Sequence, residues 1–432
     1  MAWKLKNCSM KTTHLILGLF LFCMGSPKGQ PGFKILKDAP KSSAMAGVEI
    51  LKDVNKIDIP FEYKNNLILV NVIFNKVLPL KFIFDTGAEN TILAKRSITD
   101  LMGISYEREF KVLGSDMKTE LKAYLVRGIN LNIENMVAPN QTMLVLDEDY
   151  FNFEELLGEQ IHGILGANVF KGLLVKINYE RKVLTLMKSG MGKPTYDSYQ
   201  MLPIIIEKNK PYLETFIRTQ NDTTIKVKLL LDTGAMLALL LNTDSHPGLK
   251  PPENAVSGNI GAGLGGFLTG HVGRVSALNF GDYQCNEVVT NFQDLEEGMD
   301  TTLLRGRNGI IGNMVLSRFE VIIDYPASKL YLLPNKSYHK EFKFDKSGMT
   351  IIAADFQLNK FIVHSVMPGS PAALAGIIPG DEIRKVNFVP AGMLSLERIN
   401  QIFRKDEGKK IVLVIKRHKK RTKCFFRLKK LV

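Results

Sequence analysis

The 432-residue sequence is poor in the residues that build covalently linked or metal-bound folds. It contains only four cysteines and seven histidines. Cys285 and Cys424 fall in different predicted units, and Cys8 and Cys23 lie in or beside a segment that export would remove. The histidines and cysteines also lack the spacing of a metal ligand set. We therefore expect no disulfide framework, no metal site and no cofactor.

Long apolar runs are also missing after the N-terminal segment, so no later stretch predicts a membrane span. Residues 1–25 combine early lysines with a short apolar core at 15–22, followed by the small residues Cys23 and Gly25. This pattern is typical of a signal peptide. It favours soluble export, while lipidation at Cys23 and an uncleaved anchor stay open. Residues 26–55 are interpreted as a leader or tether, with a propeptide as the alternative.

The strongest pattern is a short stretch that the sequence contains twice. Residues 83–88 read I-F-D-T-G-A, and residues 230–235 read L-L-D-T-G-A. Further positions repeat at the same spacing, and after a slip of one residue G-I-L-G at 163–166 matches G-I-I-G at 309–312. The matches over such a length indicate an internal duplication.

Each copy places an acid, Asp85 or Asp232, at the end of an apolar strand-like run. An acid in such a position is costly to ionise unless the protein uses it there. Two such acids on two copies of one unit predict a pair facing each other across a pseudo-two-fold axis. Two close carboxyls share one proton, and such a pair can activate a water molecule without a metal or a covalent nucleophile.

These motifs resemble the retropepsin-like and pepsin-like aspartic proteases, which take one D-T-G triplet from each half of the site. The resemblance covers about residues 55–335 and implies two tandem β-barrel lobes in one chain. It also implies that the two threonines brace the loops across the axis and that the two glycines give the backbone room. The supporting residues implied are Thr86, Gly87, Ala88, Thr233, Gly234 and Ala235.

The alanine after each triplet bears on the working pH. A hydroxyl at Ala88 or Ala235 would bind the carboxylate and lower its pKa, and alanine has no such group. We therefore expect a pair that works nearer neutral pH than a digestive acid protease does.

A glycine-rich stretch at 257–270 is interpreted as a mobile flap over a substrate cleft. A plain surface loop is the alternative. A nucleotide loop is disfavoured because neither a strand–helix context nor a phosphate-binding lysine accompanies the glycines. By repeat register, a shorter hairpin tip at 111–116 is the counterpart in the first half. The flap glycines expected are Gly114, Gly261, Gly263, Gly265 and Gly266.

The pattern changes after residue 335. Residues 370–383 read S-P-A-A-L-A-G-I-I-P-G-D-E-I, which resembles the signature of bacterial PDZ domains, and the likeness extends over 345–432. That resemblance implies peptide binding by addition of a strand to a sheet edge. Together with the D-T-G lobes, it is similar to exported PDZ-bearing aspartyl proteases of the Bacteroides group.

The net charge of +14 is concentrated near the C-terminus, where residues 404–432 carry 13 Lys and Arg against two acids. The basic residues alternate with apolar ones as in strands, so a solvated cationic face is the default and nucleic-acid binding is not expected. Membrane association has two open routes, lipidation at Cys23 and contact of the basic segment with anionic lipid.

The sequence thus predicts a mainly β protein with a small α+β PDZ domain. It reads as an exported aspartic endopeptidase, periplasmic or attached to the cell envelope, acting on peptide or protein substrates. The rival interpretation is an idle protease fold whose PDZ domain binds exported peptides; two intact triplets argue against it. The boundaries predicted are 1–25 signal peptide, 26–55 leader, 56–187 lobe 1, 188–200 linker, 201–335 lobe 2 and 345–432 PDZ domain.

Overall fold

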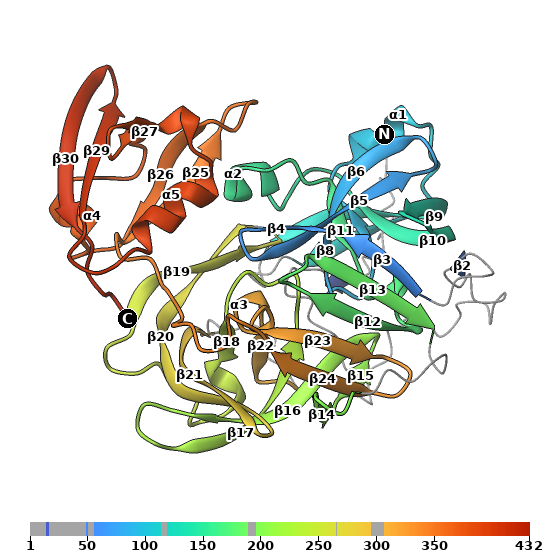
Figure 1. The fold of residues 1–432 in the computed structure, drawn as a ribbon. Coiled ribbons are helices and arrows are strands. Elements are labelled where there is room, and N and C mark those ends of the chain that lie inside the picture. The colour runs from blue at the N-terminus through green and yellow to red at the C-terminus, as the bar shows by residue number, and fades with distance from the viewer. Residues whose placement is uncertain are drawn as a thin grey trace, which may run out of the picture.

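The computed structural model describes residues 14–16, 49–50, 56–113, 119–188, 196–264, 266–294 and 306–432. Within them the chain is mainly β, with four sheets and short helices (Figure 1), as the sequence predicts. Apart from β1 (His14–Ile16) and β2 (Glu49–Ile50), the predicted signal peptide and leader lie outside the described residues. No helix in the described part of the chain is long and apolar enough to cross a membrane.

The first lobe is built on a ten-stranded sheet with the order β1-β8-β9-β10-β7-β11-β6-β5-β4, in which β2 adds to β10. Its further elements are β4 (Glu62–Lys64), β5 (Leu67–Phe74), β6 (Leu78–Phe84), β7 (Ile92–Leu93), α1 (Arg96–Leu101), β8 (Arg108–Leu113), β9 (Glu120–Ile133), β10 (Met136–Leu146), α2 (Phe153–Leu157), β11 (Gly163–Leu165) and the 3-10 turn η1 (Ala167–Val169).

The second lobe repeats this plan in an eight-stranded sheet with the order β15-β16-β17-β22-β18-β21-β20-β19. Its elements are β15 (Ile205–Glu207), β16 (Lys210–Arg218), β17 (Thr224–Leu231), β18 (Leu239–Asn242), η2 (Thr243–Ser245), β19 (Val256–Gly263), β20 (Gly266–Phe280), β21 (Tyr283–Gln293), β22 (Gly309–Ile311) and α3 (Asn313–Leu316). The hairpin β16–β17 ends at the second acid, as β5–β6 ends at the first.

A third sheet joins the two lobes. Its order is β14-β24-β23-β12-β13-β3, and β12 of the first half pairs antiparallel with β23 of the second. Its strands are β3 (Lys56–Pro60), β12 (Leu173–Asn178), β13 (Val183–Lys188), β14 (Gln200–Pro203), β23 (Phe319–Asp324) and β24 (Lys329–Pro334). One apolar core runs through this sheet into both lobes, and a second, smaller apolar cluster lies mainly in the first lobe.

The C-terminal unit is a small sheet with the order β25-β26-β27-β29-β30 and short helices against it. Its elements are β25 (Met349–Ala354), β26 (Lys360–Val366), α4 (Pro371–Leu374), β27 (Glu382–Val386), β28 (Val389–Pro390), η4 (Ala391–Met393), α5 (Leu396–Phe403), β29 (Lys410–Arg417) and β30 (Lys420–Arg427). Serine side chains begin both helices: Ser370 Oγ accepts from the Ala373 amide, and Ser395 Oγ accepts from Arg398.

Helix α5 shows why this unit folds as the sequence predicts. Its apolar residues recur on one face, and Leu396, Ile399, Ile402 and Phe403 are all buried in the core of the C-terminal unit. Figure 1 shows α5 and β25 on the side of this unit that faces the two lobes, with α2 next to β25. The α5–β25 side therefore contributes to the contact with the rest of the chain, chiefly between α2 and β25.

Candidate active site

The two acids are delivered by equivalent strand ends. Asp85 follows β6 and Asp232 follows β17, and each backbone amide donates to the neighbouring parallel strand, at Leu165 O (3.1 Å) and Ile311 O (2.9 Å). The G-I-L-G and G-I-I-G motifs supply those neighbours, β11 and β22. A Cβ at Gly163 would lie 2.2 Å from the Ile92 carbonyl oxygen, so close approach requires glycine there.

Two threonines lock the loops together across the axis. Thr86 Oγ1 donates to Leu231 O (2.7 Å) and accepts from the Thr233 amide (3.1 Å). Thr233 Oγ1 donates to Phe84 O (2.8 Å) and accepts from the Thr86 amide (3.0 Å). The four bonds are reciprocal and fully buried, so they fix each acid relative to the other half of the site.

Each D-T-G glycine lies directly against the opposite carboxyl group. A Cβ at Gly87 would stand 2.5 Å from Asp232 Cγ, and one at Gly234 would stand 2.4 Å from Asp85 Cγ. Any side chain at either position would push the facing acid away. The structure therefore brings all of the predicted D-T-G residues of both copies into one symmetrical arrangement.

The carboxyl oxygens divide into two kinds. Asp85 Oδ1 accepts from the amides of Gly87 (2.7 Å) and Ala88 (3.0 Å), and Asp232 Oδ1 accepts from Gly234 (2.8 Å). The Oδ2 atoms are buried and accept no bond from a donor group of the described residues. The two carboxyls are within hydrogen-bonding reach of one another, so a single proton can join them.

Burial is the main cause of the unusual acidity of this pair. It raises the pKa of Asp85 to about 6, although the hydrogen bond from Asp232, two amides and the charge of Lys210 pull it down. The pKa of Asp232 is raised well above its usual range by burial and by the charge of Asp85. Near neutral pH the pair therefore holds one proton, with Asp85 the more readily ionised member.

Two further hydrogen bonds support the second loop from outside the pair. Tyr179 Oη donates to Asn313 Oδ1 (2.6 Å), and Asn313 Nδ2 donates to Thr233 O (2.5 Å). Sequence reasoning missed these two residues. Tyr179 lies in a repeated segment, where its counterpart is Tyr325. The counterpart of Asn313 is Ala167, so the internal repeat did not indicate a role for Asn313.

The β19–β20 hairpin reaches from the second lobe to the first. Leu264, at its tip, is fully buried in an apolar cluster that includes Ala88 of the first lobe. Gly261, with φ of 150°, marks a register shift in the hairpin, and Gly263 and Gly266 end and begin its strands. Gly114 and Gly265 lie outside the described residues. This hairpin lies where the flap prediction needs it, and its mobility stays a prediction.

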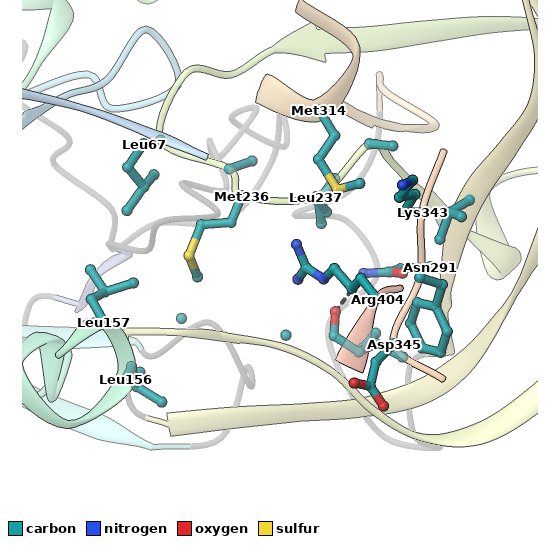
Figure 2. Close-up of a pocket in the computed structure, with 18 of the residues that line it drawn as sticks. Leu67, Leu156, Leu157, Met236, Leu237, Asn291, Met314, Lys343, Asp345 and Arg404 are labelled. Atoms are coloured by element: carbon teal, nitrogen blue, oxygen red, sulfur yellow. Dashed lines mark hydrogen bonds between the residues drawn. The ribbon is translucent and has the colours of Figure 1, made fainter. Parts of the chain in front are cut away.

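A cavity of about 200 Å³ begins at the second D-T-G loop. Its walls include that loop, the β19 end of the hairpin, α2 and β5 of the first lobe, β21 and α3 of the second, and Arg404 of the C-terminal unit. Figure 2 shows apolar side chains over most of it, with Arg404 entering from α5. Labelled lining residues in that view include Leu67, Leu156, Leu157, Met236, Leu237 and Met314.

The C-terminal unit also contacts the hairpin and α2 directly. The Phe267 ring stacks on His364 of β26, with ring centroids 3.9 Å apart. A Cβ at Gly158, which ends α2, would lie 3.1 Å from Leu396 Cβ. The unit is therefore packed against both elements that border the cavity.

Metal and thiol chemistry have little support in this region. The described residues contain no group of three His, Cys, Asp or Glu side chains that could hold a metal ion. Cys285 and Cys424 are buried as free thiols, and burial raises the pKa of Cys285 to about 11. His162 Nδ1 accepts a hydrogen bond from the Lys81 amide (3.1 Å), which is a structural role.

Comparisons with known proteins found matches among family models and among solved structures. A family model described as aspartyl protease matches residues 70–169, which include Asp85 and β11, and one described as PDZ domain matches residues 362–417. Among solved structures, basic 7S globulin from soybean is similar at 9% identity and a TM-score of 0.39, over 67% of this chain and 100% of that one. No curated protein matches the sequence. The chain thus contains an aspartyl protease domain and, towards its C-terminus, a PDZ domain.

Proposed function

We propose that this protein is an aspartic endopeptidase in which Asp85 and Asp232 together activate the attacking water. The observation that carries the proposal is the pair itself: two fully buried acids held face to face by reciprocal threonine bonds. A scaffold has no use for two desolvated carboxyls in contact, because each raises the free energy of ionising the other.

The mechanism follows from the two environments. Asp85, with the lower pKa of the pair, is ionised and takes a proton from water bound between the acids. The water oxygen attacks the peptide carbonyl carbon while Asp232, still protonated, donates to the carbonyl oxygen. As the tetrahedral intermediate collapses, the C–N bond breaks, Asp85 passes the proton taken from water to the leaving nitrogen, and Asp232 takes a proton back from a hydroxyl of the intermediate, which restores the pair. Because the proton is shared, the acid and base roles belong to the pair.

The remaining parts of the proposal depend on sequence patterns. Export rests on the signal-peptide pattern of residues 1–25, and peptide recognition by the PDZ domain rests on the usual behaviour of such domains. Peptide or protein chains that carry apolar residues near the scissile bond would suit the apolar cavity beside the second loop.

The test is cleavage of a mixed peptide library by the full chain across roughly pH 3–8, a window that brackets the reference aspartate pKa and neutrality. Asp85→Asn and Asp232→Asn should each abolish cleavage, and pepstatin should inhibit the wild type. Asp222→Asn, at a side chain 86% exposed, is the matched control and should cleave normally. A silent wild type, or a single active-site variant with undiminished activity, would overturn the proposal.

A further inference from the structure

Arg404 is the unusual member of the cavity beside the second catalytic loop. It caps the C-terminal end of α5 in the PDZ domain, so it belongs to a different unit from the catalytic acids. In Figure 2 its guanidinium group points toward Met236 and Leu237 of that loop, among apolar side chains. A charged group thus lies among the apolar side chains that line the cavity.

The guanidinium group has no partner of its own there. Among the residues that the structure describes, none forms a hydrogen bond or ion pair with it, and its influential charged neighbours are Asp345 and Glu397. Asp345 Oδ1 is already bonded to the Ser347 amide (2.9 Å), Ser347 Oγ (2.8 Å) and the Gly348 amide (2.6 Å). Figure 2 shows the Asp345 carboxylate directed away from the guanidinium group.

Arg404 is partly buried, and the charges of Asp345 and Glu397 offset only part of the hydration that its guanidinium group has lost. Burial lowers the pKa of Arg404, but the usual value is so high that the group stays cationic at neutral pH. A cation removed from water is stable only when a counter-charge and hydrogen bonds replace the lost hydration. A carboxylate is the group that matches a guanidinium fork, because it can accept two parallel hydrogen bonds.

We propose that this cavity is a substrate subsite in which Arg404 of the PDZ domain binds a carboxylate of the peptide chain, next to apolar residues of the same peptide. The inference rests on the proposed function and specifies it. The carboxylate can come from an Asp or Glu side chain or from a peptide C-terminus, and both supply the same chemistry. Lys343, on the same wall, is more exposed and adds to the positive charge.

The arrangement would make the PDZ domain part of the protease cleft. Gly234 and Ala235 of the second catalytic loop line the same cavity as Arg404, so a peptide held by Arg404 lies close to the catalytic acids. The acidic residue should then stand at one fixed number of positions from the bond that is cut. That fixed register is the signature of a subsite, as opposed to general attraction by a cationic surface.

The experiment measures kcat/KM for pairs of peptides that differ only by Glu or Gln at one position, and for pairs with a free or amidated C-terminus. The wild-type full chain should prefer the carboxylate member at one position by at least about tenfold, the effect of one charged hydrogen bond. Arg404→Gln should cleave both members of that pair equally, and Arg404→Glu should prefer Lys there. Arg398→Gln, on an exposed part of the same helix, should keep the wild-type preference.

A binding arm separates this inference from the proposed function. The inactive Asp232→Asn chain, with and without Arg404→Gln, is titrated with the same labelled peptides, and thermal unfolding confirms that each variant is folded. Preference for the carboxylate peptide that disappears with Arg404→Gln supports the subsite even if cleavage is absent. Preference confined to one pair type identifies a side-chain or C-terminal carboxylate. The subsite proposal would be overturned if the wild type bound and cleaved both members of every pair equally, or if Arg404→Gln kept the wild-type preference.

Discussion

Asp85 and Asp232 are both fully buried, and this burial determines how pH acts on the fold as well as on chemistry. A carboxyl whose pKa is raised on folding favours the folded state while it is protonated. That advantage is lost as the pH rises from the pKa of the carboxyl in the unfolded chain through its pKa in the folded protein. The buried pair of acids should therefore lower the stability of the protein at neutral pH.

Replacing one acid should relieve this penalty. The pKa of Asp85 rises from 3.8 to about 6, which at about 1.4 kcal/mol per pKa unit costs about 3 kcal/mol at pH 7. We expect Asp85→Asn to raise the free energy of unfolding by about 1–3 kcal/mol at pH 7 and by much less near pH 4, as measured by urea denaturation. Asp222→Asn should leave the free energy of unfolding unchanged at both pH values. Destabilisation at pH 7, or the same gain at both pH values, would contradict the account.

Thr86 should be as important for stability as for activity. Thr86→Val keeps the shape but removes the hydroxyl that bonds Leu231 O and the Thr233 amide, which leaves two buried backbone groups unpaired. The expected loss in free energy of unfolding is about 2–4 kcal/mol, with loss of cleavage. Thr86→Ser retains the hydroxyl and should stay within about 1 kcal/mol of the wild type by the same urea titration. Equal behaviour of the two variants would argue against the brace.

At the residue scale, sequence and structure agree where repetition carries the information. The D-T-G triplets and the G-I-[LI]-G motifs could be found because both copies had to keep the same strand ends and close approaches. Asn313, which bonds to Thr233 O, could not be found in this way because its repeat position holds Ala167. Contacts that only one half makes leave no periodic signal.

Among the elements, the β19–β20 hairpin couples the halves of the site most directly. Its glycines predicted a flap, and its tip residue Leu264 is buried against the first lobe. The sequence could not predict that contact, because it depends on how far the hairpin extends across the cleft. With the tip seated there, the hairpin joins the two halves of the site, and its lifting for substrate entry stays a prediction.

Shortening Leu264 should loosen the hairpin. Leu264→Ala removes buried apolar contacts worth about 2–3 kcal/mol, so amide hydrogen exchange in residues 256–280 should quicken by tenfold or more. Leu374→Ala, at a side chain 82% exposed, should leave exchange there unchanged. Wild-type exchange rates in Leu264→Ala would mean that the tip does not hold the hairpin down.

On the scale of the whole molecule, the PDZ domain is fastened to the second lobe by arginines. Arg274 Nη2 donates to Phe342 O (3.1 Å) and its Nε donates to Val432 O (3.3 Å), at the two ends of the C-terminal unit. Arg318 donates to backbone oxygens of Ser337, Tyr338 and Lys340 in the connecting segment. The connection between the lobes and the PDZ domain is therefore bonded along its length.

Arg274→Met should weaken this attachment. The substitution keeps an apolar stem but leaves the backbone oxygens of Glu287, Phe342 and Val432 without their charged donor, at a cost of about 2–3 kcal/mol. Limited proteolysis should then cut within residues 335–345 faster than in the wild type. Arg218→Met, at a side chain 44% exposed, provides the comparison and should resist as the wild type does. Unchanged resistance of Arg274→Met would show that other contacts seat the domain.

The arrangement of the units was the part least accessible to sequence analysis. The two lobes and the PDZ signature could be recognised one after another, because each has its own local pattern. The stacking of His364 on Phe267 and the entry of Arg404 into the cleft depend on surfaces from distant parts of the chain. Contacts between residues far apart in the chain leave no regular pattern in a single sequence, so they could not be predicted from it.

The most direct test of the shared-proton pair is the pH dependence of kcat/KM for one good peptide substrate. With the pKa of Asp85 raised to about 6 and that of Asp232 raised further, the rate should fall below about pH 6 as Asp85 gains a proton. It should fall again at high pH as Asp232 loses its proton, so the maximum lies near neutrality. A maximum below about pH 3.5, lower than the reference aspartate pKa of about 3.9, would contradict the account.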